Sequence, residues 1–344
     1  MYYSVKIPLL ENWMFNFLTT LGTKPEDALN ITNNILEAEK RGVHSHGLML
    51  LPLYISRITQ NGIKRDYQIT CNNLFPNVAI IDGDSGPGQS IAFASARKCV
   101  ELASDAGLSL VMAKNSNHVG MLASYGLEIA NHNLIGIIMT NTGPSISVPN
   151  CHGKVLGNNA ICFALPREPN PIIFDFATGV VACGKVRYAA LKNETIPAGW
   201  IKDKNDNDTT NPFDLDDGGS VLPFGDYKGY GLAFIVDVLT GVLAGSVSSL
   251  HVKTQRRHEN RSTMASQTFI SINPSHINPS FNSGLNNLVN DLRKKVDDIL
   301  LPGDKEISFC SNLKDNHVNV HEKVLKLLDE AATTNNFETI SSTL

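Results

Sequence analysis

VAIIDGDSGPGQSIAFASARKCVELASDAGLSLVMAK, residues 78–114, is the segment that decides the fold class. It begins with a short apolar run at 78–83 and ends with another at 108–114, and both runs are typical of strands. Between them, residues 89–107 carry the apolar spacing and the length of a helix. A strand, a helix and a second strand in this order predict an α/β domain.

The same alternation continues toward the C-terminus. Apolar runs and helical patterns predict strands at 135–140, 160–166, 171–176 and 267–273, and helices at 121–133, 180–193 and 228–245. We therefore expect a central α/β domain over residues 76–283.

Helical patterns dominate residues 1–60. Thr23 and Glu26 form a capping-box pattern around Pro25, and the helix that follows is expected to end at Gly42. A further helix is predicted over 48–59, where Asn61 and Gly62 end it.

Two more helices are predicted near the C-terminus, at 284–299 and 318–332. We expect residues 1–75 and 284–344, the latter with a polar tail, to pack together as one discontinuous helical domain.

Composition excludes several function classes. The 344 residues carry a net charge of −4, with 42% hydrophobic and 18% charged side chains, as in an ordinary globular protein. The basic run KTQRRH at 253–258 is short and isolated, so we do not expect nucleic-acid binding. The longest apolar segment, 230–245, contains Asp237 and several glycines, which favours a buried helix over a membrane span.

Six dispersed cysteines, without a CxxC motif, are typical of a reducing compartment. The N-terminus shows no basic region followed by an apolar stretch and a cleavage site. These features predict a cytoplasmic protein.

Two polar turns contain the candidate acid–base residues, namely RGVHSHG (41–47) with His46 and NSNHVG (115–120) with His118. Imidazole both gives and accepts protons near neutral pH, as the interconversion of a carbonyl and an alcohol requires. The alternative is a histidine that only meets a helix dipole or bonds a carbonyl. His44 and His46 also form an H-x-H pair, but without an HExxH motif or a third carboxylate we expect no metal site.

The turn GDSGPGQS (83–90) resembles part of a dinucleotide fingerprint. Gly86 and Gly88 match the first two glycines, but Ile91 occupies the third position. Lys114 ends the next strand, where a ribose-binding acid would be expected. We interpret the turn as a glycine-rich helix start.

Several blocks occur in the order typical of the malate/L-lactate dehydrogenase family, which the chain resembles over nearly its whole length. They are RGVHSHGLMLLPLYISRI (41–58), NSNHVG (115–120), TNTGPSISVP (140–149), GNNAICFALP (157–166), FDFATGVVACGKV (174–186), IPAGWIKDKNDNDTTNP (196–212), LPFGDYKGYGLAFIVDVLTGVLAG (222–245) and LPGD (301–304).

The resemblance implies an NAD(P)-dependent oxidoreductase that transfers a hydride between nicotinamide and a small-molecule substrate, a 2-hydroxyacid or 2-ketoacid. It also implies a homodimer, and a central α/β nucleotide domain that is not a Rossmann fold. NAD is the expected cofactor, with NADP as the second possibility. Two other functions stay open: reduction of a cyclic imine, and dinucleotide binding without turnover.

The resemblance also assigns roles to individual residues. His46 matches a proton donor of some members and His118 a proton acceptor of others; we prefer His46, with Ser45 beside it and Asp175 as an orienting carboxylate. The expected cofactor contacts are Thr142, Phe174, Asp175, Phe176, Ala177, Thr178, Lys228, Gly229, Gly303 and Asp304. Lys228 and Gly229 open a helix whose dipole and ammonium group suit a pyrophosphate.

The chain departs from the family pattern at Leu50, where most members carry arginine one helical turn after His46. Arginine there would bind a substrate carboxylate through two hydrogen bonds. Arg57, two turns along the same helix face, is the nearest candidate replacement, and the alternative is a solvated surface arginine. Gly179 and Cys183 also replace the usual family residues.

Overall fold

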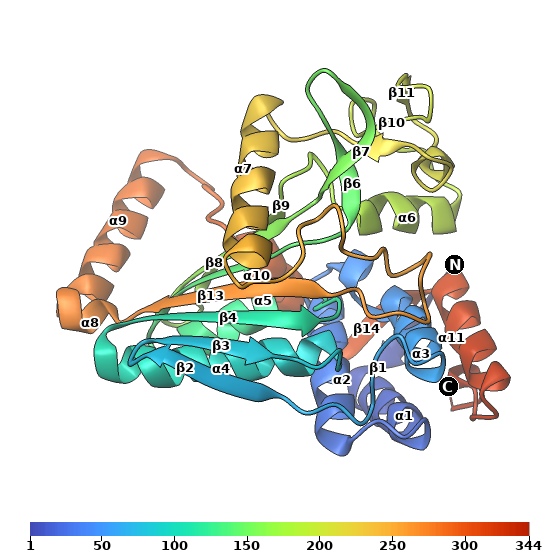
Figure 1. The fold of residues 1–344 in the computed structure, drawn as a ribbon, viewed down its shortest axis with the longest axis horizontal. Helices are drawn as coiled ribbons and strands as arrows, with labels where there is room; N and C mark the ends of the chain where they lie inside the picture. The colour runs from blue at the N-terminus through green and yellow to red at the C-terminus, as the bar shows by residue number, and fades with distance from the viewer. Residues whose placement is uncertain (344) are drawn as a thin grey trace.

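A computed structural model describes residues 1–343 of the chain. A seven-stranded mixed sheet forms its centre (Figure 1), with the strand order β2-β3-β4-β13-β5-β8-β9. The strands are β2 (Thr70–Phe75), β3 (Val78–Asp82), β4 (Leu108–Ser116), β5 (Ile135–Thr140), β8 (Ala160–Leu165), β9 (Ile172–Ala177) and β13 (Ala265–Ile272). Within this sheet only β3 and β4 pair in parallel. The predicted α/β class is confirmed.

Helices α4 (Gly88–Ala106) and α5 (Ala123–Ala130) cover one face of the sheet. Strand residues alternate between the two faces, so Ile138 packs with these helices while Met139 packs on the opposite face. That opposite face is covered by α7 (Tyr227–Asp237) and the π-helix η4 (Val238–Val242). The strand–helix–strand prediction for 78–114 is correct to within two residues at each boundary.

A smaller five-stranded sheet lies above the central sheet in Figure 1. It contains β6 (Pro144–Val148), β7 (Cys151–Gly157), β10 (Ile201–Lys202), β11 (Asp208–Thr209) and β12 (Ser220–Val221), and α6 (Cys183–Lys192) shares its core. The sequence did not predict this sheet, because three of its strands have only two residues.

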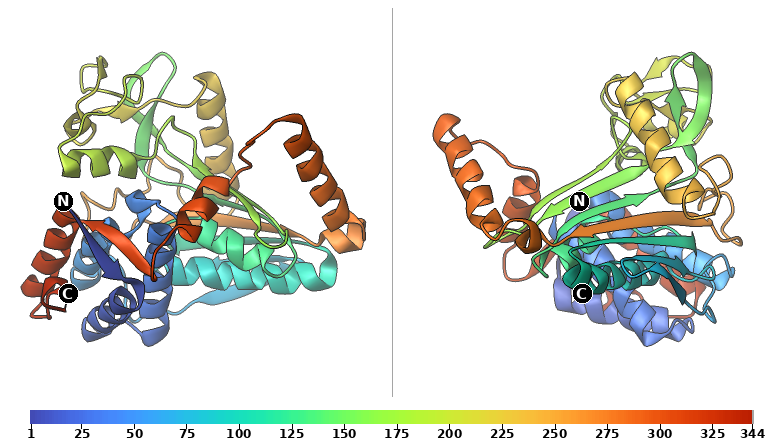
Figure 2. Two further views of the ribbon diagram at one scale, coloured as in Figure 1. Left: turned by 180° about the vertical axis from the view of Figure 1, so that it is seen from behind. Right: turned by 60° about the vertical axis from the view of Figure 1, so that its left-hand side comes forward.

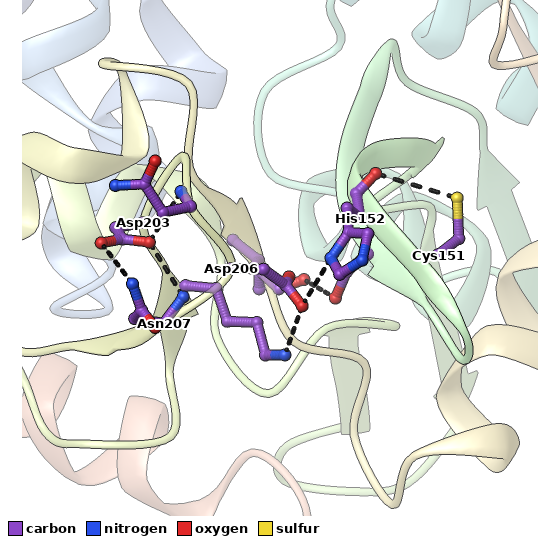
Figure 3. A network of polar contacts seen from close by, with 9 residues as sticks. Cys151, His152, Asp203, Asp206 and Asn207 are labelled. Atoms are coloured by element: carbon purple, nitrogen blue, oxygen red, sulfur yellow. Dashed lines mark hydrogen bonds and ion pairs between the residues drawn. The ribbon is translucent and has the colours of Figure 1, made fainter.

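A polar network at the rim of this sheet holds one turn in place (Figure 3). Asp203 Oδ1 accepts hydrogen bonds from the backbone N–H groups of Asn205 and Asn207, at 2.8 and 2.9 Å. Asp206 Oδ2 lies 3.0 Å from both Lys202 Nζ and His152 Nδ1. This network belongs to the turn and contains none of the predicted site residues.

The two ends of the chain pack together. Strand β1 (Tyr2–Lys6) pairs antiparallel with β14 (His317–His321), and one apolar core contains residues from both ends. Its helices are α1 (Ile7–Thr20), α2 (Pro25–Lys40), α3 (Leu51–Thr59) and α11 (Glu322–Thr334), with the short helices η1 (His44–His46), η2 (Leu48–Leu50) and η5 (Ile340–Thr343). Phe17 and Phe337 stack with their ring centroids 4.6 Å apart.

Three predictions about these ends are wrong in detail. Residues 2–6 and 317–321 form strands, because each supplies the other's hydrogen bonds from more than 300 residues away. The capping box does not form: Pro25 is the first helical residue, so Lys24 becomes the N-cap, and Thr23 Oγ1 is buried without a partner among the described residues.

Helices α8 (Pro274–Ile277), α9 (Phe281–Lys295) and α10 (Asp304–Ser311) lie outside the core shared by the two chain ends. Figure 2 shows α9 standing away from the rest of the chain, and Val289 is its only buried residue. Among residues 1–343, no helix is long and apolar enough to cross a bilayer.

We expect Phe17→Ala to destabilise the protein by about 3–5 kcal/mol, because it opens a cavity in the core that joins the two chain ends. Phe75→Ala is the matched control, since the Phe75 side chain is 64% exposed. Chemical unfolding followed by circular dichroism measures both variants. Equal unfolding midpoints for the two variants would contradict this account of the core.

Candidate active site

Glu39, on α2, organises the turn that contains His46. This buried carboxylate accepts a hydrogen bond from Leu48 N–H at 2.7 Å through Oε1 and lies 2.6 Å from His44 Nδ1 through Oε2. A Cβ at Gly47 would lie 2.1 Å from Glu39 Oε1, so only glycine fits there. Although burial lowers it, Glu39 raises the pKa of His44 above its ordinary value, so His44 is the partner of Glu39.

His46 and His118 face one another from different parts of the fold. Their rings are nearly parallel, with an interplanar angle of 11° and centroids 6.2 Å apart. The Tyr54 hydroxyl, on α3, lies 2.7 Å from His118 Nδ1, and Gly120 N–H donates to the same nitrogen at 3.3 Å. These contacts fix the His118 ring from its Nδ1 side and leave Nε2 free.

Both imidazoles are neutral at pH 7. Burial lowers the pKa of His46 to about 4, and Lys185 adds to the effect. Burial lowers the pKa of His118 to about 3, helped by the charges of His46, Arg57, Arg256 and Arg187. A neutral imidazole accepts a proton from a bound hydroxyl group, so the pair suits the oxidation of an alcohol.

Of the two residues predicted to support His46, Ser45 and Asp175, only Ser45 lies beside its ring. Ser45 Oγ lies 3.0 Å from His46 Nδ1, beside the ring as expected. Asp175 Oδ2 instead accepts a hydrogen bond from Ala123 N–H, at 2.8 Å, where α5 begins. Solvent reaches Asp175, yet the surrounding protein raises its pKa to about 6. Its hydrogen bond fixes the start of α5, so the expectation that Asp175 orients His46 is corrected.

The predicted cofactor residues Thr178 and Gly229 come together where β9 ends and α7 begins. Phe224 N–H donates to Thr178 O at 3.1 Å, and a Cβ at Gly229 would lie 2.5 Å from the same oxygen. Thr178 Oγ1 is buried and has no hydrogen-bond partner in the described chain. An orphaned hydroxyl beside a close backbone contact is consistent with a polar ligand here.

Asn159 connects this region to Thr142. Its Oδ1 accepts from Thr142 N–H at 2.9 Å, its Nδ2 donates to Ala233 O at 2.8 Å, and its backbone oxygen accepts from Thr178 N–H at 3.0 Å. Asn159 is not among the predicted site residues, because an asparagine at the start of an apolar strand gives no local signal of such a role.

Gly303 and Asp304 lie beside β9. A Cβ at Gly303, whose φ is +87°, would lie 2.9 Å from Ile173 O. Asp304 Oδ2 accepts from Leu301 N–H at 2.9 Å and forms a 3.7 Å ion pair with Arg293. Three more predicted residues follow Ile173 on β9, namely Phe174, Phe176 and Ala177, and the two phenylalanine rings stack at 4.4 Å.

Lys228 fits an anion through its charge and the helix dipole. The side chain is exposed and forms no ion pair with any residue from 1 to 343. Its backbone N–H already donates to Gly225 O at 3.2 Å, and Gly229 N–H donates to Phe224 O at 2.8 Å. The ammonium group and the dipole of α7 are therefore the features available to a phosphate.

The glycine turn at 86–88 has a packing role. A Cβ at Gly86 would lie 2.3 Å from the Tyr67 ring, and one at Gly88 would lie 2.3 Å from His118 O. Glycine at these positions lets α4 approach the turn that carries His118. These contacts account for both glycines without a bound phosphate.

Leu50 and Arg57 are both buried. Leu50 is 5% exposed and packs within the helical core. Arg57 is fully buried and donates to Gln255 O, His258 O, Gly62 O, Asn117 Oδ1 and Arg261 O at 2.8–3.2 Å. Two alternatives were expected for Arg57: a side chain that binds the substrate carboxylate, or a solvated surface arginine. The buried Arg57 side chain, bonded to these five oxygens, fits neither.

We expect the stability of the protein to fall between pH 7.5 and pH 5. Unfolded histidine binds a proton below about pH 6.5, whereas folded His118, with its pKa of about 3, does not. The unfolded state then binds more protons, so acidification to pH 5 removes about 2 kcal/mol through this one residue.

His118→Asn should lose about 2 kcal/mol less stability over this range than the wild type, in chemical unfolding at each pH. His132→Asn, at an exposed histidine, controls for the substitution itself. If the free energy of unfolding of wild type and of His118→Asn changes equally with pH, the pKa of His118 is not lowered by folding.

Known proteins resemble this chain over most of its length. The profile of the malate/L-lactate dehydrogenase family matches residues 5–329. The malate dehydrogenase of Pyrococcus abyssi is 33% identical over 345 residues, covering 95% of this chain and 94% of that protein. The NAD(+)-dependent ureidoglycolate dehydrogenase of Escherichia coli K12 is 33% identical, covering 77% and 75%. The solved malate dehydrogenase of Pyrococcus horikoshii OT3 superposes with a TM-score of 0.89 at 30% identity, covering 98% and 97%. This chain belongs to the malate/L-lactate dehydrogenase family.

Proposed function

We propose that this protein is a nicotinamide-dependent oxidoreductase that interconverts a 2-hydroxyacid and a 2-ketoacid of the malate or lactate type. The observation that carries the proposal is the facing pair His46 and His118, 6.2 Å apart, with Tyr54 hydrogen-bonded behind His118. A substrate oxygen bound at the nitrogen edges of these two rings would have an acid–base group of either residue within reach.

His118 is the proposed proton-transfer residue. Its Nδ1 is hydrogen-bonded to the Tyr54 hydroxyl, so Nε2 is presented in a fixed direction. In the oxidising direction the tautomer that carries its proton on Nδ1, donated to the Tyr54 hydroxyl oxygen, takes the hydroxyl proton of the substrate at Nε2. In the reducing direction the imidazolium form returns a proton to the carbonyl oxygen. Because a side chain of another element, Tyr54 on α3, holds its ring, we prefer His118 to His46, whose Nδ1 is hydrogen-bonded among residues 1–343 only to the adjacent Ser45.

NAD is the proposed cofactor, and NADP is the alternative. The bound nicotinamide would accept or deliver the hydride at the substrate carbon. Thr142, the strand end at 174–178 and Gly229 provide close backbone approaches, Lys228 offers a cation for a phosphate group, and Gly303 and Asp304 complete the loop beside β9.

The protein is proposed to act as a cytoplasmic homodimer. All six cysteines are free thiols, which agrees with a reducing compartment. On α7, η4 and the segment after them, five large apolar side chains are exposed, as expected of a surface that a second copy covers. They are Phe234, Ile235, Val242, Leu243 and Leu250.

The proposed activity predicts oxidation of NADH in the presence of pyruvate or oxaloacetate. We expect His118→Asn to lower kcat about 10²–10⁴-fold, the usual contribution of general acid–base catalysis, with little change in NADH affinity. Steady-state absorbance at 340 nm measures kcat, and NADH fluorescence measures binding. His132→Asn is the control.

A panel of 2-ketoacids and cyclic imines, each assayed with NADH and NADPH, separates the remaining possibilities. Turnover of the imines alone would identify an imine reductase. Cofactor binding without turnover of any compound would identify a binding protein. Either result contradicts the proposed reaction.

Lys228→Ala should weaken NADH binding by about 1–3 kcal/mol, the range of a charged hydrogen bond. Fluorescence titration gives the dissociation constants, with Lys326→Ala on α11 as a control at another exposed lysine. An unchanged NADH dissociation constant in Lys228→Ala would remove this lysine from the cofactor site.

A further inference from the structure

A 2-ketoacid or 2-hydroxyacid substrate carries a carboxylate, and this group loses water when it approaches the two histidines. It therefore needs a positively charged partner in the site. Leu50 cannot supply one, and the Arg57 side chain is enclosed by protein oxygens. The candidates are therefore the other cations near the two histidines, namely Lys185, whose charge acts on His46, and the arginines whose charges act on His118.

Besides burial, the charges of three arginines lower the pKa of His118: Arg57, Arg256 and Arg187. Arg187, on α6, is engaged with the Asp216 carboxylate through contacts of 2.7, 3.0 and 3.2 Å. Within residues 1–343, Arg256 forms neither a hydrogen bond nor an ion pair through its side chain. Of the three guanidinium groups, only that of Arg256 makes no hydrogen bond or ion pair within residues 1–343, whereas Arg57 keeps a single buried Nε–H without a partner.

The backbone on either side of Arg256 is fixed to α3. Arg57 Nη1 donates to Gln255 O at 3.1 Å and to His258 O at 3.2 Å. The Glu259 carboxylate accepts hydrogen bonds from the side chains of Ser56 and Gln60. Arg256 therefore projects from a segment held one turn beyond Tyr54, whose hydroxyl contacts His118.

The same segment links the cofactor side of the site to His118. At one end, a Cβ at Gly143 would lie 2.8 Å from Val252 O, so the segment packs against the turn that follows Thr142. At the other end, Thr263 N–H donates to Asn117 Oδ1 at 3.0 Å, directly before His118. Arg256 lies between these two anchor points.

We propose that Arg256 binds the substrate carboxylate through its guanidinium fork and thereby places the reacting carbon beside His118. This assignment rests on the proposed function and deepens it. Two parallel N–H···O bonds fix both the position and the rotation of a planar carboxylate, which lysine does not do. Arg256 is thus a residue that determines specificity for 2-substituted acids.

A bound carboxylate also changes the charge that His118 experiences. Arg57, Arg256, Arg187 and His46 all disfavour its imidazolium form in the free protein. An anion bound at Arg256 offsets part of this positive charge and favours protonation of His118. Binding of a ketoacid then prepares the proton that reduction of its carbonyl consumes.

Kinetics of Arg256→Gln and Arg256→Lys test the assignment, with Arg257→Gln as the matched control at the neighbouring exposed arginine. We expect Arg256→Gln to raise KM for pyruvate or oxaloacetate about 10- to 150-fold, the loss of charged hydrogen bonds. The dissociation constant of NADH should stay within twofold, which also shows that the variant is folded. Arg256→Lys should recover only part of the loss, and Arg257→Gln should match the wild type.

Two further measurements separate this role from a structural one. Added guanidinium ion should restore part of the activity of Arg256→Gln. Oxamate, which carries a carboxylate and an amide, should bind the wild-type NADH complex at least tenfold tighter than the Arg256→Gln complex. If the wild type reduces ketoacids and Arg256→Gln keeps its KM and oxamate affinity, the assignment is wrong while the proposed function stands. If the wild type reduces no ketoacid, the proposed function itself fails, and the assignment fails with it.

Discussion

The buried guanidinium of Arg57 is the interaction on which the rest of the site depends. It joins α3 of the helical unit, the Gly62 turn, Asn117 at the end of β4 and three backbone oxygens of the 255–261 segment. Burial lowers the pKa of Arg57 to about 10, so it stays charged at neutral pH. A buried cation without its partners is costly by several kcal/mol, and this penalty holds the four segments together.

This constraint explains why the site forms where it does. Asn117 Oδ1 accepts from Arg57 and from Thr263 N–H, while its Nδ2 donates to Ser85 O and Gly86 O at 2.8 and 2.9 Å. His118 follows Asn117 directly, so its position is set by a neighbour whose side-chain amide is hydrogen-bonded through both its oxygen and its nitrogen. Tyr54 and Arg57 are three residues apart on one helix, and each meets the histidine turn from the same side.

Sequence patterns predicted the parts of the structure that depend on local preferences. The apolar periodicity of α4 predicted this helix, which ends at the left-handed Gly107. The apolar runs on either side of it predicted the two flanking strands. The two histidine turns were also recognised from their local composition. Long-range features were missed: β1 and β14 pair across the whole chain, and Arg57 is buried only because carbonyl groups about 200 residues away satisfy it. Asn159 and Glu39 escaped notice for the same reason, since their partners lie on other elements.

A crystal structure of the protein with NADH and oxamate tests the central claim most directly. The account predicts the oxamate carboxylate on Arg256, its carbonyl oxygen between His46 and His118, and the nicotinamide against the turn that contains Thr142. It also predicts that Arg57 keeps its five oxygen partners in the complex. NADH bound at the 86–91 turn, or an oxamate carboxylate held by a cation other than Arg256, would contradict it.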